Sequence, residues 1–493
     1  MSAPMRLDTL LAGFADPGPH AGLMVNGLGL DSRQLHAGDA FIALAGSRGH
    51  GLQFAAQAEA AGAVAVIAET DNATALAAPR IPLVPVAGLR ENLGSIAARF
   101  YGDATRSLRV IGVTGTNGKT STVQLLAQAL YALGRKPATI GTLGSGLHGH
   151  IDAGERTTPD AISVQRLMAD FRDAGASDVA MEVSSHALSQ ARVAGVHFHL
   201  AVFTNLTRDH LDYHGDMQSY ANAKQGLFRM PGLAAAAINL DDECGRRFFS
   251  ELPAGVAAIG FGIEHADAAV RGSRIETRAA GLGFDLHSPW GEARIESRLL
   301  GRFNVSNLLA VVASLGLLGY DFNAICAALA ELDPVPGRMN RLGGSEGCAL
   351  VVIDYAHTPD ALQQALASAR EHCANQLLCV FGCGGERDVG KRPLMAEIAE
   401  RLADRVIVTD DNPRSEDGAR IVADILAGFD RAEAVVVERD RRRAIERAVG
   451  GAGPGDVVLI AGKGHEPYQE VNGVMHAFDD FEVARTAIEA RPC

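Results

Sequence analysis

The sequence predicts an α/β protein of three domains, in which a small N-terminal α/β domain precedes two larger domains that are each built on a doubly wound parallel sheet. Three observations support this fold class. The chain has 493 residues, too many for one hydrophobic core, and this length suggests about three domains. Hydrophobic residues make up 47% of the chain, enough to bury such cores. Short apolar runs alternate with helical stretches, as expected for parallel strands that helices cover on both faces.

Residues 1–106 predict the small N-terminal domain. Short apolar runs, which we interpret as strands, lie at residues 40–44, 63–67 and 83–86. Alanine-rich helical stretches separate them. This alternation is typical of a small α/β unit.

Residues 107–336 predict the central domain, which opens on the most informative stretch of the chain, Val110-Ile-Gly-Val-Thr-Gly-Thr-Asn-Gly-Lys-Thr-Ser121. An apolar strand leads into a glycine-rich loop, and Lys119 and Thr120 then open an amphipathic helix that Gly134 ends. Backbone N–H groups of the loop and helix N-terminus, together with the Lys119 charge, suit a phosphate, and the Thr120 hydroxyl suits Mg²⁺. We therefore expect a P-loop-type sheet with a nucleoside triphosphate site.

The loop departs from the standard phosphate-binding pattern, because Val113 stands where that pattern has glycine. The alternative is a glycine-rich turn that binds no phosphate. The motif by itself indicates a nucleotide and leaves the reaction open.

Further strands are expected along the rest of the central segment, at residues 179–183, 200–204, 235–239 and 256–260. Residues 265–300 read as β-hairpins, a helix follows at 304–318, and Asp333-Pro-Val-Pro-Gly337 supplies a break. Residues 337–493 predict a third, Rossmann-like doubly wound domain. Its expected strands, which alternate with helices, lie at 350–354, 377–381, 406–409, 434–437 and 457–461.

Composition narrows the possible partners and compartment. A net charge of −13 argues against a nucleic acid or an anionic membrane as the main partner. No apolar run reaches a membrane-spanning length, and the N-terminus lacks a signal-peptide pattern, so we expect a cytoplasmic protein without membrane insertion. Cys379 and Cys383 lack a second cysteine pair, so we interpret them as reduced packing residues rather than zinc ligands.

Polar residues follow several predicted strands of the central domain, where ligands bind in open α/β sheets. Glu182 and His210 lie in two such segments, and a carboxylate and an imidazole close to a phosphate loop suit Mg²⁺ held against the γ-phosphate. The alternative is a metal hydrolase. Its ligands would be Asp209, His210, Asp212 and His214.

At this point the motifs together resemble the Mur ligases, the ATP-dependent amide-bond-forming enzymes of peptidoglycan synthesis. The resemblance runs through nearly the whole chain, and so many ordered matches are very improbable by chance. The matching motifs are Gly115-Thr-Asn-Gly-Lys-Thr120, Thr157-Thr-Pro-Asp160, Glu182-Val-Ser-Ser-His186, Thr204-Asn-Leu-Thr-Arg-Asp-His-Leu-Asp-Tyr-His214, Asn304-Val-Ser-Asn307, Asp354-Tyr-Ala-His-Thr-Pro359, Asp411-Asn-Pro-Arg414 and Gly462-Lys-Gly-His-Glu466.

The resemblance implies that the first domain holds the UDP end of a UDP-muramoyl-dipeptide and that the central domain holds ATP and the rest of that substrate. The implied substrate contacts are Leu30, Ser32, Ser47, Arg156, Thr157, Thr158, Ser184, Gln190 and Arg192. The implied ATP contacts are Gly115, Thr116, Asn117, Gly118, Lys119, Thr120, Ser121, Asn304, Arg338 and Asp354. A solvated polar loop is nearly as good an interpretation of residues 47–49, and Arg338 could equally form a linker salt bridge.

Lys224 aligns with the lysine that this family carries as a carbamate, a group that can hold a second Mg²⁺. The alternative is an unmodified lysine that pairs with phosphate or a carboxylate. The resemblance implies Lys119, Lys224, His210 and Glu182 as the catalytic set. It implies Thr120, Glu182, His210 and Lys224, the last as N6-carboxylysine, as the metal set.

The C-terminal motifs imply the acceptor amino acid. A planar guanidinium at Arg414 can take a carboxylate through two hydrogen bonds, and lysine-adding relatives lack arginine there, so the resemblance implies meso-diaminopimelate. The implied contacts are Arg387, Asp411, Asn412, Pro413, Arg414, Gly462 and Glu466. The alternative for residues 411–414 is an Asn-Pro turn with a solvated arginine.

The implied reaction joins diaminopimelate to the D-glutamate γ-carboxylate of UDP-N-acetylmuramoyl-L-alanyl-D-glutamate through an acyl phosphate, with ATP and Mg²⁺. We expect a monomer whose partners are these small molecules. Two alternatives remain at this stage, a folylpolyglutamate synthetase-like ligase and a non-enzymatic nucleotide switch.

Overall fold

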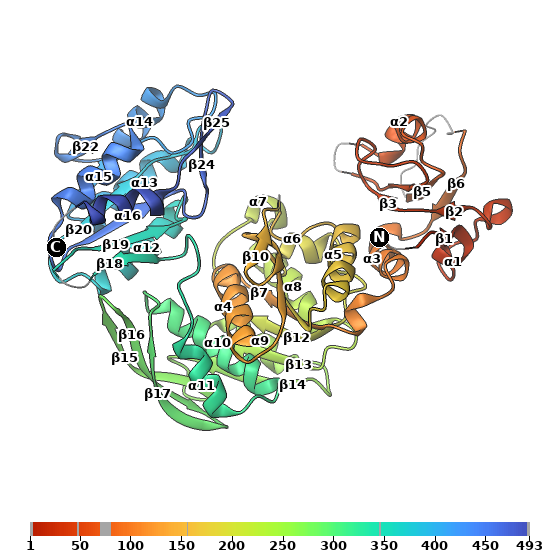
Figure 1. Cartoon of the computed structure of the whole chain (residues 1–493), viewed down its shortest axis with the longest axis horizontal. Helices are drawn as coiled ribbons and strands as arrows, with labels where there is room; N and C mark the ends of the chain where they lie inside the picture. Colours follow the sequence, from red (N-terminus) through yellow and green to blue (C-terminus); the bar gives the residue numbers. More distant parts are fainter. Residues whose placement is uncertain (1–2, 47–48, 70–79, 155, 345–346, 491–493) are drawn as a thin grey trace. The chain divides into compact units, whose positions relative to one another are not determined.

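The computed structural model describes residues 3–46, 49–69, 80–154, 156–344 and 347–490. The chain forms two compact units, Met1–Gly260 and Phe261–Cys493. Figure 1 shows their helices and strands. Within the described residues, the helices are all too short or too polar to cross a membrane.

The N-terminal part of the first unit contains a four-stranded sheet that is parallel throughout. Its strands, in spatial order, are β3 (Leu28–Gly29), β4 (Ala40–Ala43), β5 (Ala65–Glu69) and β6 (Leu83–Val86). A short antiparallel pair and three helices accompany it: β1 (Met5–Arg6), β2 (Met24–Val25), α1 (Leu7–Leu11), α2 (Ala55–Ala60) and α3 (Leu89–Phe100). The apolar face of α3 packs in a core that also includes Ala161 and Ile162, so this small sheet is joined by buried contacts to the segment that follows.

A second sheet in this unit carries the phosphate loop. Its strands, in spatial order, are β10 (His150–Asp152), β9 (Gly144–Leu147), β8 (Pro137–Gly141), β11 (Asp178–Glu182), β7 (Arg109–Thr114), β12 (Phe198–Phe203), β13 (Ala235–Asn239) and β14 (Ala257–Gly262). Strands β8, β11, β7, β12 and β13 run parallel. The loops after β11, β7 and β12 therefore leave the sheet side by side. The helices are α4 (Lys119–Ala132), α5 (Ala161–Asp173), α6 (Ser185–Ser189), α7 (Leu211–His214), α8 (Met217–Gln225) and α9 (Glu243–Ser250).

Close packing explains the two glycines that flank Val113 and Thr114. A Cβ at Gly112, inside β7, would lie 2.7 Å from the Phe198 ring. A Cβ at Gly115, which has a φ of +155°, would lie 1.9 Å from the Thr204 hydroxyl. The glycines of this loop are thus placed by contact with the neighbouring strand β12, and Val113 remains an ordinary buried strand residue.

The second unit begins with antiparallel strands and two helices. Strands β15 (Val270–Arg278), β16 (Gly281–Ser288) and β17 (Gly291–Ser297) form consecutive hairpins, and β15 pairs with Phe261 and Gly262 at the end of β14. Helices α10 (Phe303–Leu317) and α11 (Phe322–Ala330) follow.

A six-stranded sheet forms the rest of this unit. Its order is β18 (Asn340–Gly343), β19 (Leu350–Asp354), β23 (Val457–Ala461), β20 (Leu377–Phe381), β21 (Arg405–Val408) and β22 (Val436–Val437), all parallel except β18. Alternate strand residues face two cores, as in a doubly wound sheet. Helices α12 (Pro359–Glu371), α13 (Lys391–Leu402) and α14 (Gly418–Leu426) cover one face, and α15 (Arg441–Gly451) and α16 (Asp480–Glu489) cover the other. A hairpin of β24 (Tyr468–Val471) and β25 (Val474–Ala477) precedes α16.

The predicted fold class is confirmed. Strands β6, β13, β19, β20 and β23 have the predicted bounds, and the predicted hairpins at 265–300 are present. Cys379 and Cys383 are buried, free cysteines, as predicted. The prediction for 434–437 is wrong in part, because a 3-10 turn at Ala432–Ala434 leaves only two residues for the edge strand. The hairpins β9–β10 and β24–β25 were not predicted, because their short, glycine-rich or mixed-polarity segments carry no clear period.

Candidate active site

The predicted phosphate loop lies between β7 and α4, as expected. The segment after β12 holds it: the Thr116 and Asn117 amides donate to the backbone and side-chain oxygens of Asn205, each at 2.9 Å. Lys119 folds over the loop, where its Nζ donates to the carbonyls of Gly115 (2.9 Å) and Thr116 (2.8 Å). Contacts within the protein therefore shape the loop.

Lys224, on α8, is buried against this loop. Its Nζ donates to the Gly115 carbonyl at 2.7 Å and lies 4.4 Å from the centre of the Tyr220 ring. Burial, and next the positive charge of Lys119, hold the pKa of Lys224 well below its ordinary value. A buried lysine in this environment favours the neutral amine, which is the form that acts as a nucleophile.

Glu182 ends β11 and is also buried. Its carboxylate accepts hydrogen bonds from the Thr142 amide (2.7 Å) and hydroxyl (3.3 Å), and its backbone carbonyl accepts one from the Thr158 hydroxyl (2.8 Å). Thr142 also contacts the Thr157 hydroxyl at 3.0 Å. Glu182 thus connects the loop after β8 with the predicted substrate threonines. Sequence reasoning missed Thr142, which belongs to none of the recognised motifs.

Three histidines and two tyrosines gather beside Lys224. The His186 ring centre lies 4.8 Å from that of His210 and 5.4 Å from that of His214, and Tyr213 and Tyr220 pack against the group. Burial, and next the charge of His210, lower the pKa of both His186 and His214. The described residues include no group of three or more His, Cys, Asp or Glu side chains that could hold a metal ion, so the metal-hydrolase alternative gains no support.

The residues that are predicted to contact the dipeptide lie close together and bind one another. Arg192 donates to the Thr158 carbonyl (3.0 Å) and through Nε and Nη2 to the Gln190 amide oxygen (3.0 and 2.6 Å). The Ser184 amide donates to the Thr158 hydroxyl at 3.2 Å. Burial, and next the charge of Arg156, lower the pKa of Arg192. Two arginines near one another suit an anionic ligand.

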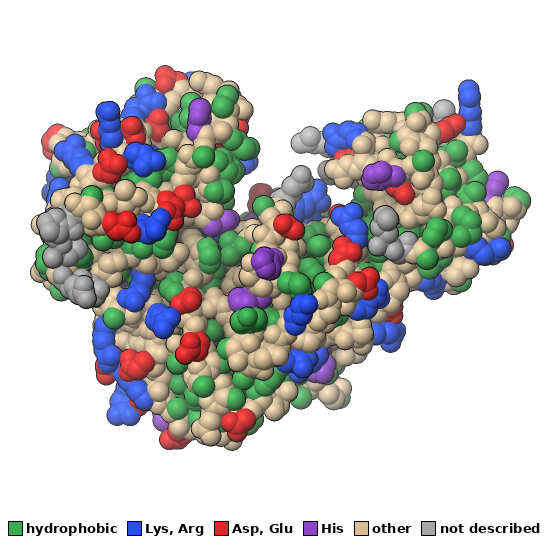
Figure 2. Space-filling model, viewed as in Figure 1, with side chains coloured by type: hydrophobic (Ala, Val, Ile, Leu, Met, Phe, Trp, Pro, Cys, Tyr) green, Lys and Arg blue, Asp and Glu red, His purple; other side chains and the backbone are tan. Residues whose placement is uncertain are grey.

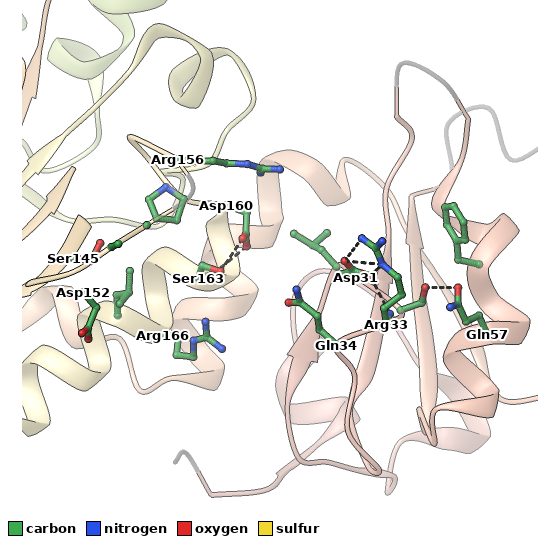
Figure 3. A pocket seen from close by; sticks show the side chains of 17 residues that line it. Asp31, Arg33, Gln34, Gln57, Ser145, Asp152, Arg156, Asp160, Ser163 and Arg166 are labelled. Carbon is green, nitrogen blue, oxygen red and sulfur yellow. Dashed lines mark hydrogen bonds and ion pairs between the residues drawn. The ribbon is translucent and has the colours of Figure 1, made fainter. Parts of the chain in front are cut away.

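A cavity of about 810 Å³ adjoins this group, and it brings together the predicted residues Leu30, Ser32 and Arg156. Figure 3 shows Arg156 and Arg166 on one wall, and Asp31 and Gln34 from the segment after β3 with Gln57 from α2 on the other. The Ser32 hydroxyl donates to the Gln57 side chain at 2.9 Å. The volume is within the range of small-molecule sites. Sequence reasoning missed Arg166 and Gln57, and the predicted residue Ser47 lies outside the described residues.

Three residues of the second unit, Asp354, Arg338 and Asn304, are predicted to contact the nucleotide, and each has different neighbours. Burial raises the pKa of Asp354, whose carboxylate accepts a hydrogen bond from the Met339 amide at 2.8 Å. The Arg338 guanidinium lies 5.4 Å from the centre of the Tyr355 ring. Asn304 is buried on α10, where its side chain donates to the Leu300 carbonyl (2.7 Å).

The predicted acceptor residues lie on neighbouring loops of the second unit. Arg414 has a φ of +55°, and its Nη1 donates to the Gly385 carbonyl at 2.8 Å while its Nε lies 3.2 Å from the Glu470 carboxylate. The Arg414 amide donates to the Glu470 carbonyl at 3.0 Å. Arg387 follows Gly385 on an exposed loop. Sequence reasoning missed Glu470, which comes from the hairpin β24–β25.

Asn412 joins the other acceptor residues. Its side-chain Nδ2 donates to the Glu466 carboxylate at 2.9 Å, and its Oδ1 accepts from the buried Lys463 at 2.9 Å. Burial raises the pKa of Asp411, although Arg441 and Lys463 oppose the effect. A Cβ at Gly462 would lie 2.3 Å from the Asp411 carboxylate, which accounts for glycine there. The structure therefore groups Asp411, Asn412, Gly462 and Glu466.

Figure 2 shows how charged side chains are distributed on one face of the molecule. Acidic and basic side chains are interspersed there, without a large field of one sign. The local positive charge that a phosphate-rich ligand requires is instead found at Lys119 and at the paired arginines Arg156 and Arg192.

The chain matches three Mur ligase domains, and the matched residues together span most of its length. They are the Mur ligase family catalytic domain at residues 24–101, the Mur ligase middle domain at 113–315 and the Mur ligase glutamate ligase domain at 337–464.

Two curated relatives and one solved structure match over nearly the full length. A protein of Xanthomonas oryzae is 54% identical over 100% of this chain and 99% of its own, and one of Pseudomonas aeruginosa is 50% identical over 99% of each. Both are named UDP-N-acetylmuramoyl-L-alanyl-D-glutamate–2,6-diaminopimelate ligase. A solved structure of the same name is 38% identical, covers 99% of each chain and has a TM-score of 0.75. The chain therefore belongs to the Mur ligase family.

Proposed function

We propose that this protein is an ATP-dependent ligase that joins meso-diaminopimelate to the γ-carboxylate of D-glutamate in UDP-N-acetylmuramoyl-L-alanyl-D-glutamate. The observation that carries the choice of amino acid is the position of Arg414, whose Nη1 and Nε are fixed by Gly385 and Glu470 beside Asn412. A guanidinium held in this way suits a second carboxylate, which diaminopimelate has and lysine lacks. The names of the full-length relatives agree with this choice.

ATP is proposed to bind at the loop of residues 115–121, with its phosphates on the helix α4 N-terminus and Lys119 released from its loop carbonyls to meet them. Asn304, Arg338 and Asp354 remain the candidates for the rest of the nucleotide. The domain roles proposed are UDP-substrate binding by residues 1–106, ATP binding by 107–336 and amino-acid binding by 337–493.

The residues beside the loop fit Mg²⁺. Thr120, Glu182 and His210 supply a hydroxyl, a carboxylate and an imidazole, and the buried Thr114 hydroxyl has no hydrogen-bond partner among the described residues. Lys224 fits only in a modified form, because an ammonium would repel the ion. When bound, Mg²⁺ would neutralise charge on the phosphates.

We propose that Lys224 carries a carbamate. Its neutral amine nitrogen would form a bond to the carbon of CO₂ and lose a proton, leaving an anion in place of a cation. Its low pKa and its position at the Gly115 carbonyl support this assignment.

The reaction then follows from charge and positioning. An oxygen of the substrate γ-carboxylate bonds to the γ-phosphorus of ATP as the bond to ADP breaks, which gives an acyl phosphate. The amine of diaminopimelate bonds to the acyl carbon, a proton leaves the nitrogen, and the tetrahedral intermediate expels phosphate. Lys119 would stabilise the negative charge that gathers in the first step, and exclusion of water would protect the acyl phosphate.

The N-terminal cavity is proposed to take the UDP end of the substrate. Arg156, Arg166 and the polar groups of Ser32 and Gln57 line it and suit a pyrophosphate and a base. We further propose a cytoplasmic monomer whose partners are small molecules.

Phosphate release from ATP tests the proposal. The purified protein is supplied with Mg²⁺ and UDP-N-acetylmuramoyl-L-alanyl-D-glutamate, with meso-diaminopimelate or L-lysine in parallel. Release that requires diaminopimelate supports both the reaction and the amino acid. Release with lysine instead would retain the ligase and refute the assignment of Arg414, and ATP binding without release in either case would favour the nucleotide switch.

A further inference from the structure

One carboxylate, that of Glu416, connects the two loops that carry Arg387 and Arg414. It accepts hydrogen bonds from Nη1 and Nη2 of Arg392, both at 2.7 Å, and from the backbone amide of Glu386 at 3.0 Å. Glu416 is two residues from Arg414, and Glu386 is next to Arg387. The Glu416 side chain thus contacts both the Arg392 guanidinium and the loop that carries Arg387.

Arg392 anchors this carboxylate. It lies on α13 with a fully buried side chain, and it also donates to Asp424 on α14 at 2.8 Å. Paired hydrogen bonds between guanidinium and carboxylate fix direction as well as distance. The pKa of Glu416 is lowered to about 2, chiefly by its hydrogen bonds with Arg392, so the carboxylate is ionised at neutral pH.

The two loops need such an anchor because both contain a strained residue. Glu386 and Arg414 have φ values of +54° and +55°, in the left-handed region that non-glycine residues rarely occupy. The loops also touch directly, since the Gly385 amide donates to the Asn412 carbonyl at 2.9 Å and a Cβ at Gly385 would lie 2.0 Å from the Pro413 carbonyl. Backbone hydrogen bonds to Glu470 and Asn472 hold Arg414, whereas the amide of Glu386 is held by Glu416.

We infer that Glu416 is a positioning residue for the acceptor amino acid: it sets the spacing between Arg387 and Arg414 and thereby selects an amine that carries two carboxylates. The inference rests on the proposed function, in which Arg414 meets one carboxylate of the acceptor, and it assigns the other carboxylate to Arg387. Glu416 acts through these arginines and does not itself touch the amino acid.

The test compares Glu416→Gln with Asp424→Asn as a matched control. Both variants remove one carboxylate charge from the same Arg392, and only the first changes the side chain that accepts the hydrogen bond of the Glu386 amide. For Glu416→Gln we expect the KM for meso-diaminopimelate to rise about tenfold or more, which is the effect of losing a charged hydrogen bond. The KM values for ATP and for the UDP-dipeptide, and kcat, should stay within about twofold, as should every parameter of Asp424→Asn.

Hydrogen exchange of the backbone amides supplies a second readout that requires no turnover. Peptides that cover residues 382–390 should exchange faster in Glu416→Gln than in the unaltered protein, and should be unchanged in Asp424→Asn. If the unaltered protein gives no turnover with diaminopimelate, the proposed function fails, and the exchange pattern still decides whether Glu416 fixes the loop.

Three results would overturn the inference. The first is a KM for diaminopimelate in Glu416→Gln that equals that of the unaltered enzyme. The second is an equal rise in the KM for ATP, which indicates a general structural effect. The third is the same change in Asp424→Asn. If Glu416→Gln does not fold, Glu416→Asp, which keeps the charge for Arg392 and shortens the reach to Glu386, must raise the KM for diaminopimelate selectively.

Discussion

Lys119 and Lys224 share one acceptor, because the Nζ atoms of both lysines donate to the carbonyl oxygen of Gly115, at 2.9 and 2.7 Å. Two ammonium groups at such a short separation repel one another strongly, because burial excludes the water that would weaken the repulsion. Lys224 is the more buried of the two and has the lowered pKa, so it is the lysine that favours the neutral form. The carbonyl of Gly115 thus brings Lys119 together with a buried lysine whose pKa is lowered.

The first prediction concerns the modification of Lys224. Protein equilibrated with ¹³C-bicarbonate should show a carbamate carbon signal in NMR spectra that Lys224→Arg lacks, because guanidinium does not form a carbamate under these conditions. The variant should lose most phosphate release, since it replaces the proposed anion by a cation. Lys136→Arg, which changes an exposed lysine, should keep both the signal and the activity. A signal that survives in Lys224→Arg would assign the carbamate to another residue.

A second prediction follows from the lowered pKa of Glu416. The native pKa of about 2 lies below the ordinary value of 4.5, so the contribution of this ionised group to stability is fully present above pH 4.5 and is lost as the pH falls toward 2. The difference in the free energy of unfolding between the unaltered protein and Glu416→Gln should therefore be constant above pH 5, by urea titration, and should shrink below pH 4.5. A difference that does not change with pH would show that the charge of Glu416 makes no contribution.

The fold could be predicted from the sequence wherever an apolar run was continuous and bounded by turn residues. The strands at Leu350–Asp354 and Val457–Ala461 are of this kind, because a strand buried on both faces must be apolar at every position. Edge strands are exposed and need no such run, which explains why β22 was overpredicted and the hairpin β24–β25 was missed.

Candidate site residues could be predicted only where they belong to contiguous motifs. Asp411, Asn412, Arg414 and Glu466 were predicted in this way, and the structure groups them. Residues that hold neighbouring loops were missed, because their partners lie far away along the chain: Glu416 is 30 residues from the Glu386 amide that it accepts from, and Thr142 is 40 residues from Glu182. Such contacts follow from the folded arrangement of loops and leave no local pattern.

The third prediction concerns the planar group of Arg414. Arg414→Lys keeps the positive charge but loses the planar guanidinium, which can form hydrogen bonds with Gly385, Glu470 and a carboxylate ligand at the same time. The KM for meso-diaminopimelate should rise ~10- to 100-fold, the effect of a hydrogen bond to a charged group, with no gain in activity toward lysine. Arg439→Lys is the control: Arg439 is half-exposed and pairs with Asp410, and this variant should leave the KM for diaminopimelate unchanged. Equal KM values for both variants would place the acceptor carboxylate elsewhere.

The fourth prediction concerns Arg166, which lines the cavity proposed for the UDP end of the substrate. Arg166→Ala removes a cation from that wall, so the KM for UDP-N-acetylmuramoyl-L-alanyl-D-glutamate should rise ~10-fold while the KM values for ATP and diaminopimelate stay unchanged. Calorimetric titration with UDP alone should show weaker binding by the same factor, because the arginine acts on the pyrophosphate. Arg229→Ala, at an exposed ion pair with Glu251 outside the cavity, should leave both measurements within about twofold. Weaker ATP binding in Arg166→Ala, with UDP binding intact, would instead mean that the cavity takes a different ligand, because the cation would then serve the nucleotide triphosphate rather than the UDP-linked substrate.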